Sequence, residues 1–470
     1  MVDNKRDEFV PWRELLNSQY GVSLVLVCMG IWLHAADSLI VATMLPAIVD
    51  EIGGLGLVNW SVALYSLGSI IAGAMSAVLT IRFGLRLPMA GAALMFGLGC
   101  ILSAIAPEMW LLLLGRLLQG IGGGGLIAMS FVAVSILFPK RLIARAMATI
   151  STLWGISAFL GPLIGGFFVE YANWRFCFWF FAAQAVLLFA WILFGAKVPE
   201  KQTDGVGNNI PFIRLVVLLA GVVFIAYGGV DISPLRTTLL IVAGLSCLLL
   251  FLRLDTKEDG THLLPSRAFD LRSPVGAALS MILALSIATM ALSTYGPLLF
   301  ILIHGVSALG AGYIVACSAF GWTIMAVLVS GSPEKHDGKY IAWGMLIASL
   351  SIIGFAYSVP AGPIWLIAVF AALEGGGFGV AWTFILRRAT AGASPVEAQR
   401  ISAAIPTVQR LGHALGAAYV GIVANAVGFE SVTTSIQGAI AAKVIFLSCL
   451  PFAAIGLIAM IRLVRQPNTS

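Results

Sequence analysis

Apolar runs long enough to cross a lipid bilayer follow one another from about residue 20 almost to the end of the chain. A membrane-spanning helix needs about 20 mainly apolar residues. The chain has 470 residues, of which 60% are hydrophobic and 10% are charged, whereas soluble proteins carry about 25% charged residues. The composition therefore excludes a large soluble domain and predicts an all-α integral membrane protein.

The apolar runs predict about fourteen membrane-spanning helices. They cover residues 20–49, 59–80, 87–105, 109–137, 142–169, 175–196, 210–230, 235–254, 272–303, 308–330, 338–358, 363–388, 398–428 and 440–464. Most of the 27 lysines and arginines fall in alternate loops, as expected because cytoplasmic loops carry the positive charge. This alternation predicts an even number of spans with both termini in the cytoplasm. It also accounts for the net charge of +6 without a nucleic-acid partner.

One segment of the chain recurs in its second half. A constant shift of 255 residues takes residues 145–166 onto residues 400–421, and it also takes the preceding glycine-rich helix onto a copy of itself. The identical pairs are Arg145 and Arg400, Ala148 and Ala403, Ile150 and Ile405, Thr152 and Thr407, Gly161 and Gly416, Gly166 and Gly421, Gly120 and Gly375, Gly122 and Gly377, and Gly124 and Gly379. One offset across two helices and their loop indicates an internal duplication, an architecture known in transporters.

Two of the predicted spans, residues 210–230 and 235–254, fall outside both copies of the duplication. They are bracketed by polar linkers, and we interpret them as a peripheral hairpin that fills a gap between two bundles. The predicted organisation is a cytoplasmic N-terminal segment at 1–19, an N-terminal six-helix bundle at 20–199, linkers with the two extra helices at 200–270, a C-terminal six-helix bundle at 271–464 and a cytoplasmic tail at 465–470.

Two acidic residues lie well inside predicted spans. A charge near the bilayer centre costs a few kcal/mol, so such residues usually face a cavity or a partner. Asp37 follows His34 by three residues and shares its helix face, and Glu374 is the counterpart of Gln119 in the duplication. We interpret both acids as proton sites. The alternative for each is a structural contact between helices.

Two arginines also fall inside predicted spans. Arg116 can hold a carboxylate or an anionic substrate group, and we predict that it is coupled to Asp37; alternatively, it braces backbone carbonyl groups. Arg410 is followed one turn later by His413. The predicted substrate-cavity residues are His34, Gln119, Arg410, His413 and Trp382, with Trp154, Phe131 and Tyr65 as further aromatic candidates.

The sequence offers no sign of an enzyme. The nearest approach to a phosphate-binding loop is Gly338-Lys339, but Tyr340 follows where Ser or Thr is required. The six cysteines are scattered singly, without the spacing of a metal site. We therefore predict no catalytic residues, no cofactor and no metal, and we expect an ion gradient to supply the energy.

Three motifs resemble those of one transporter family. The first reads Gly161-Pro162-Leu163-Ile164-Gly165-Gly166, the second runs from Leu111 to Gly120 and contains Arg116, and the third is DSLIVATMLP from Asp37 to Pro46. They resemble the antiporter, fourth-span and first-span motifs of the major facilitator superfamily, in its fourteen-span drug:proton antiporter group. The resemblance covers nearly the whole chain. It implies the major facilitator fold of two parallel six-helix bundles plus two extra central spans, and a proton-coupling role for Arg116 and Asp37.

The loop between the second and third spans departs from the family pattern. It keeps Arg82, Gly84 and Arg86 but has Ile81 where the family has an acidic residue. In the family, that acid belongs to a cytoplasmic latch of the outward-open state. Its loss predicts altered gating or a divergent subfamily with a different substrate.

These observations predict a proton-coupled secondary transporter that exports amphipathic small molecules by alternating access, as multidrug efflux pumps do. We expect a monomer in the plasma membrane, specifically a bacterial inner membrane, with lipid, protons and a small-molecule substrate as partners. The glycines of residues 161–166 and 412–421 are expected to let the bundles close tightly, and Asp37, Arg116 and Glu374 to open onto one central cavity. The alternatives are a proton-coupled importer of a small solute and a lipid flippase.

Overall fold

The structure is a computed structural model that describes residues 9–54, 57–195, 212–230, 233–257, 262–429 and 432–466. Its helices are α1 (Trp12–Leu15), α2 (Ser18–Ile52), α3 (Val58–Phe83), α4 (Arg86–Ala104), α5 (Met109–Leu137), α6 (Lys140–Tyr171), α7 (Trp174–Phe194), α8 (Phe212–Val230), α9 (Pro234–Lys257), α10 (Pro274–Ala288), α11 (Met290–His304), α12 (Ala308–Val329), α13 (Asp337–Ala361), α14 (Ile364–Ala389), α15 (Pro395–Ala426), α16 (Ser435–Ser448) and α17 (Leu450–Arg465). The outermost parts of both predicted tails and most of the first predicted linker lie outside the described residues.

Twelve helical stretches in the described part of the chain are long and apolar enough to cross a membrane. The prediction of about fourteen spans is therefore not confirmed. The difference comes from the predicted spans at 210–230 and 398–428. The apolar stretch of α8 is only Ile213–Ile225, and α15, although 32 residues long, is interrupted by polar and charged residues such as Gln399, Arg400 and Arg410.

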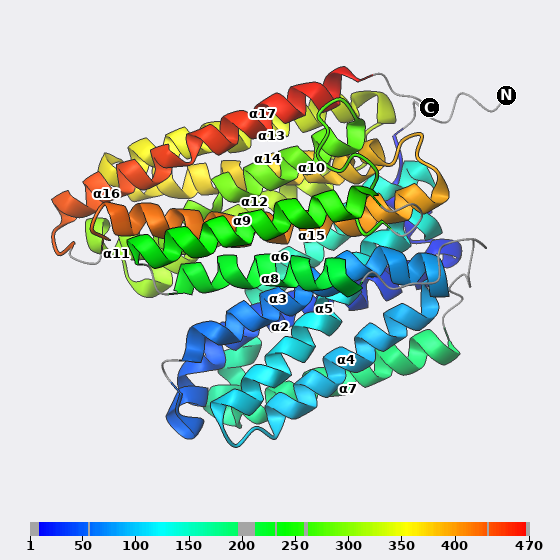
Figure 1. Cartoon of the computed structure of the whole chain (residues 1–470), viewed down its shortest axis with the longest axis horizontal. Helices are drawn as coiled ribbons and strands as arrows, with labels where there is room; N and C mark the ends of the chain where they lie inside the picture. The colour runs from blue at the N-terminus through cyan, green and yellow to red at the C-terminus, as the bar shows by residue number, and fades with distance from the viewer. Residues whose placement is uncertain are drawn as a thin grey trace.

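The helices form two groups that lie beside each other (Figure 1). Helices α2 to α7 make up the N-terminal group, in which α5 packs most extensively on α3 and α4. Helices α10 to α17 make up the C-terminal group, in which α14 packs in the same way on α12 and α13. Helix α8 contacts both α15 and α3, so the α8–α9 pair borders both groups.

Glycines of the recurring sequence allow the closest contacts inside each group. A Cβ atom added at Gly120 of α5 would overlap the Tyr65 carbonyl group of α3, and one added at Gly375 of α14 would overlap the Ser318 carbonyl group of α12. Helices can approach this closely only where the side chain is a hydrogen atom. Glycines related by the 255-residue shift therefore allow the same close packing of helices in both groups.

The two groups meet through α6 and α15, the helices that carry the recurring segment. Helix α6 packs on α12 and α14, and α15 packs on α3 and α5. The Trp322 indole Nε1 donates a hydrogen bond to the Ser151 hydroxyl (3.1 Å), and the Thr323 hydroxyl donates to the Ser151 carbonyl oxygen (3.1 Å). These bonds tie α12 directly to α6.

The glycines that we expected at this interface pack inside the groups instead. Gly161 and Gly165 face α2, and Gly412 and Gly416 face α10 and the start of α11. The expectation that they bring the bundles together was therefore wrong, because a glycine pattern reveals close packing without revealing the partner helix. At Gly155 of α6, by contrast, an added Cβ would overlap the Thr323 hydroxyl of α12.

The first described residues are held between the two groups. The Val10 amide donates a hydrogen bond to the Gly331 carbonyl oxygen just after α12 (3.0 Å). The Val10 carbonyl oxygen accepts from Nε (2.8 Å) and Nη2 (2.6 Å) of Arg145 on α6, and Arg145 Nη1 donates to the Ser330 hydroxyl (2.9 Å). The Arg145 guanidinium also lies 4.4 Å from the Trp12 ring centroid. We call residues 9–12, Arg145, Ser330 and Gly331 the N-terminal clasp.

Candidate functional site

A buried ion pair joins α2 to α5. Arg116 Nη1 donates to Asp37 Oδ2 (2.7 Å) and to Gln119 Oε1 (2.6 Å), and Gln119 Nε2 donates in turn to Cys100 Sγ (3.3 Å). Asp37 and Arg116 are only 1% and 2% exposed. The guanidinium also lies over the Tyr65 ring, 4.3 Å from its centroid. Asp37 and Arg116 are thus in direct contact.

His34 extends this cluster to the C-terminal group. Its Nδ1 is 2.9 Å from the Tyr65 hydroxyl oxygen, that hydroxyl is also 3.1 Å from the His34 carbonyl oxygen, and Arg410 of α15 contacts Nε2. A guanidinium can only donate hydrogen bonds, so Nε2 accepts and the neutral imidazole carries its proton on Nδ1. Tyr65 then accepts from Nδ1–H and donates to the His34 carbonyl group. Charged residues of the two groups are therefore connected through His34.

Glu374 occupies a different environment on α14. It is 5% exposed, and the Ser318 side chain of α12 lies beside its carboxyl group as a hydrogen-bond donor. Within the described part of the chain, no lysine or arginine forms an ion pair with it. The two buried acids thus differ, because Asp37 has a cation and Glu374 has only a hydroxyl group.

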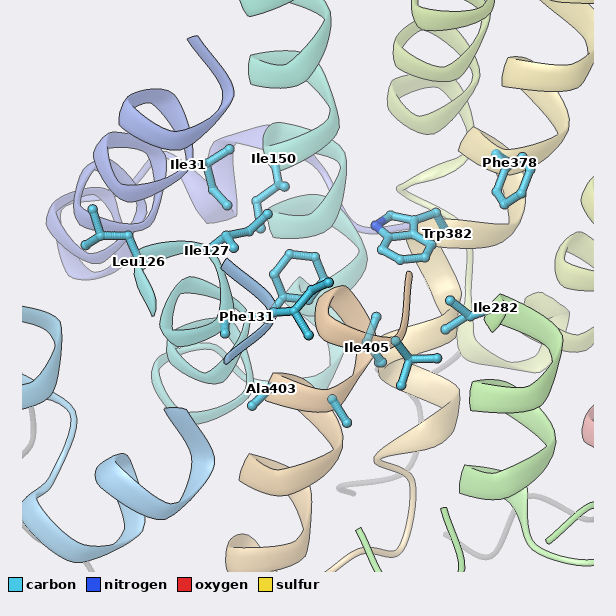
Figure 2. Close-up of a cluster of buried hydrophobic side chains, with 14 of the residues drawn as sticks. Ile31, Leu126, Ile127, Phe131, Ile150, Ile282, Phe378, Trp382, Ala403 and Ile405 are labelled. Atoms are coloured by element: carbon cyan, nitrogen blue, oxygen red, sulfur yellow. The ribbon is translucent and has the colours of Figure 1, made fainter. Parts of the chain in front are cut away.

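A cavity of about 410 Å³ lies between the two groups. Its walls come from α2, α5 and α6 on one side and from α11, α12, α14 and α15 on the other. Phe131 of α5 and Trp382 of α14 meet edge to face across it, with ring centroids 6.2 Å apart, and Figure 2 places both in one cluster with Ile150 and Ile405. The cavity is therefore largely apolar.

Three of the predicted cavity residues, Arg410, His413 and Trp382, line this cavity, as do the aromatic candidates Trp154 and Phe131. The other predicted residues do not line it: His34, Tyr65, Gln119, Asp37, Arg116 and Glu374. The expectation that both acids and Arg116 open onto one cavity was thus wrong for this conformation. These groups are at most 5% exposed because close packing of the glycine-containing helices encloses them. His34 adjoins the cavity wall through Arg410 and Trp154, and Glu374 adjoins it through Ser318.

Several cavity residues escaped the sequence analysis. Ser318 and Trp322 lie one turn apart on α12, and both line the cavity together with Ser151 and Thr323. Trp322 stacks on Phe378, with centroids 5.3 Å apart. Serine and tryptophan are common in apolar helices, so composition did not single them out. Their one usable signal was the four-residue spacing, which puts Ser318 and Trp322 on one helix face.

The residues of the predicted loop motif stabilise the N-terminal group. Gly84 ends α3 with φ +74°, and Arg82 lies over the Phe83 ring at 4.9 Å. Arg86 Nε donates to the Ile192 carbonyl oxygen at the end of α7 (3.2 Å). Ile81 is buried at 2% exposure, in the position where the family has an acid.

The corresponding loop of the C-terminal group does contain an acid. Asp337 begins α13 and accepts a hydrogen bond from Arg387 Nε (2.9 Å), and Arg387 Nη2 donates to the Ser332 carbonyl oxygen (3.1 Å). Both side chains of this ion pair are nearly buried. A charged pair thus joins the start of α13 to α14 in the C-terminal group.

The model of the Major Facilitator Superfamily matches residues 27–417. The chain belongs to this superfamily. A probable multidrug-efflux transporter of Mycobacterium tuberculosis is 30% identical over 459 residues, which cover 95% of each chain. The multidrug efflux pump SdrM of Staphylococcus aureus is 23% identical over 407 residues, which cover 85% of this chain and 89% of the pump.

Solved structures of superfamily members share the fold. The human organic anion transporter MFSD10 superposes with a TM-score of 0.66 at 14% identity, covering 94% of this chain and 99% of that one. The proton:xylose symporter XylE gives a TM-score of 0.64 at 14% identity, covering 94% and 95%. The protein is therefore an all-helical major facilitator transporter. The grouping of the described His, Cys, Asp and Glu residues offers no set of three that could hold a metal ion.

Proposed function

We propose that this major facilitator protein is a proton-coupled exporter of amphipathic small molecules. Asp37 and Glu374 are its proton sites, and Arg116 is the coupling partner of Asp37. The names of the efflux relatives support the export direction. The largely apolar cavity between two helix groups supports an amphipathic substrate.

One observation carries this proposal: the buried Asp37–Arg116 ion pair is connected through Tyr65 and His34 to Arg410 in the cavity wall. Protonation of Asp37 removes the negative partner of Arg116, and a buried cation without a partner is strongly unfavourable. The cluster must then rearrange, and His34 and Arg410 transmit the rearrangement to α15. Because α15 packs against α3 and α5, a change there alters how the two groups meet.

We further propose the topology in which this mechanism operates. Helices α8 and α15 complete fourteen spans in a six, two and six arrangement, since α15 packs between helices of both groups. Both termini are cytoplasmic in a bacterial plasma membrane, and the protein functions as a monomer. The N-terminal group, the central pair and the C-terminal group follow the boundaries 20–199, 200–270 and 271–464.

Transport in proteoliposomes tests the function. The purified protein is reconstituted, everted vesicles are selected, and accumulation of anionic, neutral and cationic fluorescent amphiphiles is followed with an acidic lumen. An antiporter accumulates its substrate under this gradient, and a proton symporter does not. Asp37→Asn and Glu374→Gln should each abolish gradient-driven accumulation, whereas Asp50→Asn, at an exposed acid on α2, should retain it.

Full gradient-driven activity in both acid variants would reject the proton sites. Loss in only one of them would assign the other acid a structural or substrate-contacting role. Accumulation under the opposite gradient would favour a proton-coupled importer. Movement of labelled phospholipid between leaflets, without uptake of any amphiphile, would favour a flippase.

A further inference from the structure

The formal charge of the cavity wall is positive. Among the described residues that line it, Arg410 carries the charge and none is Lys, Asp or Glu. His413 lies one helical turn further along α15, so it belongs to the same face and adds a polar imidazole to the wall. A solute that enters between the two groups therefore meets a guanidinium group and no carboxylate.

The two buried acids of the candidate site, Asp37 and Glu374, already have partners. Asp37 is held by Arg116 at 2.7 Å, and Glu374 is separated from the cavity by Ser318, which both bonds to it and lines the wall. Arg410 contacts His34, a neutral acceptor in the hydrogen-bonding arrangement described above. The positive charge of Arg410 thus has no neutralising partner among the described residues.

Arg410 also has spare hydrogen-bonding capacity. Its Nε atom is buried and has no hydrogen-bond partner among the described residues. A buried donor without an acceptor is unfavourable, and so is an uncompensated charge at membrane depth. An anionic oxygen removes both penalties, because carboxylate, sulfonate and phosphate groups accept charge-assisted hydrogen bonds from a guanidinium.

The rest of the wall suits the body of such a molecule. The indole rings of Trp154, Trp322 and Trp382 and the ring of Phe131 surround the same space. Aromatic walls bind planar apolar groups. They can also attract cations through their faces, but here Arg410 repels a cation and no carboxylate offsets that repulsion.

We propose that the substrates of this cavity are amphipathic organic anions, held by Arg410 at the charged end and by the tryptophans at the apolar end. The inference rests on the proposed function, because it names the substrate class of the same cavity. It goes beyond that function by predicting that charge discriminates between substrates of equal size and hydrophobicity.

Binding to the purified full-length protein in detergent provides the test. The probes are 2-naphthylacetate, its amide and 2-(2-naphthyl)ethylammonium, which carry the same ring with negative, neutral and positive groups, and their affinities are measured by titration calorimetry. Wild type should bind the carboxylate about tenfold or more tightly than the ammonium compound, the scale of one charge-assisted hydrogen bond. Arg410→Gln should remove this preference with little change for the amide, Arg410→Lys should keep most of it, and Arg462→Gln on α17 should behave as wild type.

A second variant keeps the test decisive if Arg410→Gln folds poorly. Gln409→Glu puts a carboxylate on the wall beside Arg410, so it should weaken binding of the carboxylate and strengthen binding of the ammonium compound. Equal wild-type affinity for the two charged probes would overturn the proposal, as would an anion preference that survives both Arg410→Gln and Gln409→Glu. Binding requires no gradient, so Arg410-dependent anion binding without gradient-driven transport would refute the exporter function alone. Gradient-driven transport at equal rates for anionic, neutral and cationic amphiphiles would refute the anion class alone.

Discussion

Helices α5 and α14 occupy equivalent positions in the two helix groups, yet their buried polar residues differ. Gly120 and Gly375 make the same close contacts with α3 and α12. Gln119 of α5, however, lies in a cluster with an ion pair, whereas its counterpart Glu374 has only a hydroxyl group beside it. The duplicated features are those of backbone packing, and the charges have diverged. We infer that the two groups share a scaffold but divide the chemistry between them.

Removing the positive charge of Arg116, the partner of Asp37, should have the largest effect. Arg116→Met leaves the buried carboxylate of Asp37 without its partner, a change that costs about 3–5 kcal/mol in buried pairs. We expect a marked fall in melting temperature in detergent and complete loss of transport. Adding Asp37→Asn should restore much of the melting temperature but no transport. A single Arg116→Met variant that melts like wild type would show that the ion pair does not stabilise this group.

Adding a methyl group to the duplicated glycines tests the shared scaffold. Gly120→Ala and Gly375→Ala each force a Cβ atom into a neighbouring backbone, and overpacking of this kind typically costs about 1–3 kcal/mol. Both variants should lower the melting temperature by similar amounts. Gly312→Ala, at a helical position with open space around the added atom, should change it little. If only one of the two close-contact variants is destabilised, the packing of the two groups is not equivalent.

Neutralising the acid of the C-terminal group should affect transport far more than stability. Glu374→Gln retains an oxygen that can accept the hydrogen bond from Ser318, and no ion pair is broken. We expect a stability change below about 1 kcal/mol, together with loss of gradient-driven transport in proteoliposomes. A large fall in melting temperature with transport preserved would instead make Glu374 a structural residue.

The smallest effect is expected in the loop between α3 and α4. Arg82 is partly exposed and lies over the Phe83 ring at 4.9 Å, and such contacts contribute about 0.5–1 kcal/mol at exposed sites. Arg82→Gln should therefore leave the melting temperature and the initial transport rate close to those of wild type. Strong inhibition of transport, with normal melting, would indicate that this loop still acts as a latch despite Ile81.

The membrane class and the Asp37–Arg116 contact were predictable from sequence for one physical reason. Hydrocarbon cannot solvate charges, so long apolar runs identify the helices and a buried acid requires a partner. The same reasoning could not reveal which residues line the cavity. Hydrophobicity in a membrane protein does not distinguish a helix face that meets lipid from one that meets a cavity, and Trp322 was missed for that reason.

Helix α15 shows why hydropathy also fails to count every membrane-spanning helix. Its polar side chains lower its hydropathy, and they lie where it packs between other helices and borders the cavity. A helix shielded from lipid in this way can carry Gln409, Arg410 and His413 without the penalty that lipid contact would impose. Hydropathy is therefore least informative for the helix that carries Arg410, the charged residue of the cavity wall.

The N-terminal clasp has a consequence for how the protein is made. Residues 9–12 are among the first to leave the ribosome, yet Gly331, whose carbonyl oxygen accepts the Val10 amide hydrogen bond, is synthesised only after two thirds of the chain. During translation, domains tend to fold in order from the N-terminus. Residues 9–12 can therefore contact Arg145 of the N-terminal group before Gly331 has been synthesised. Their docking on Gly331 would then be a late step of biogenesis that joins the earliest part of the nascent chain to a much later one.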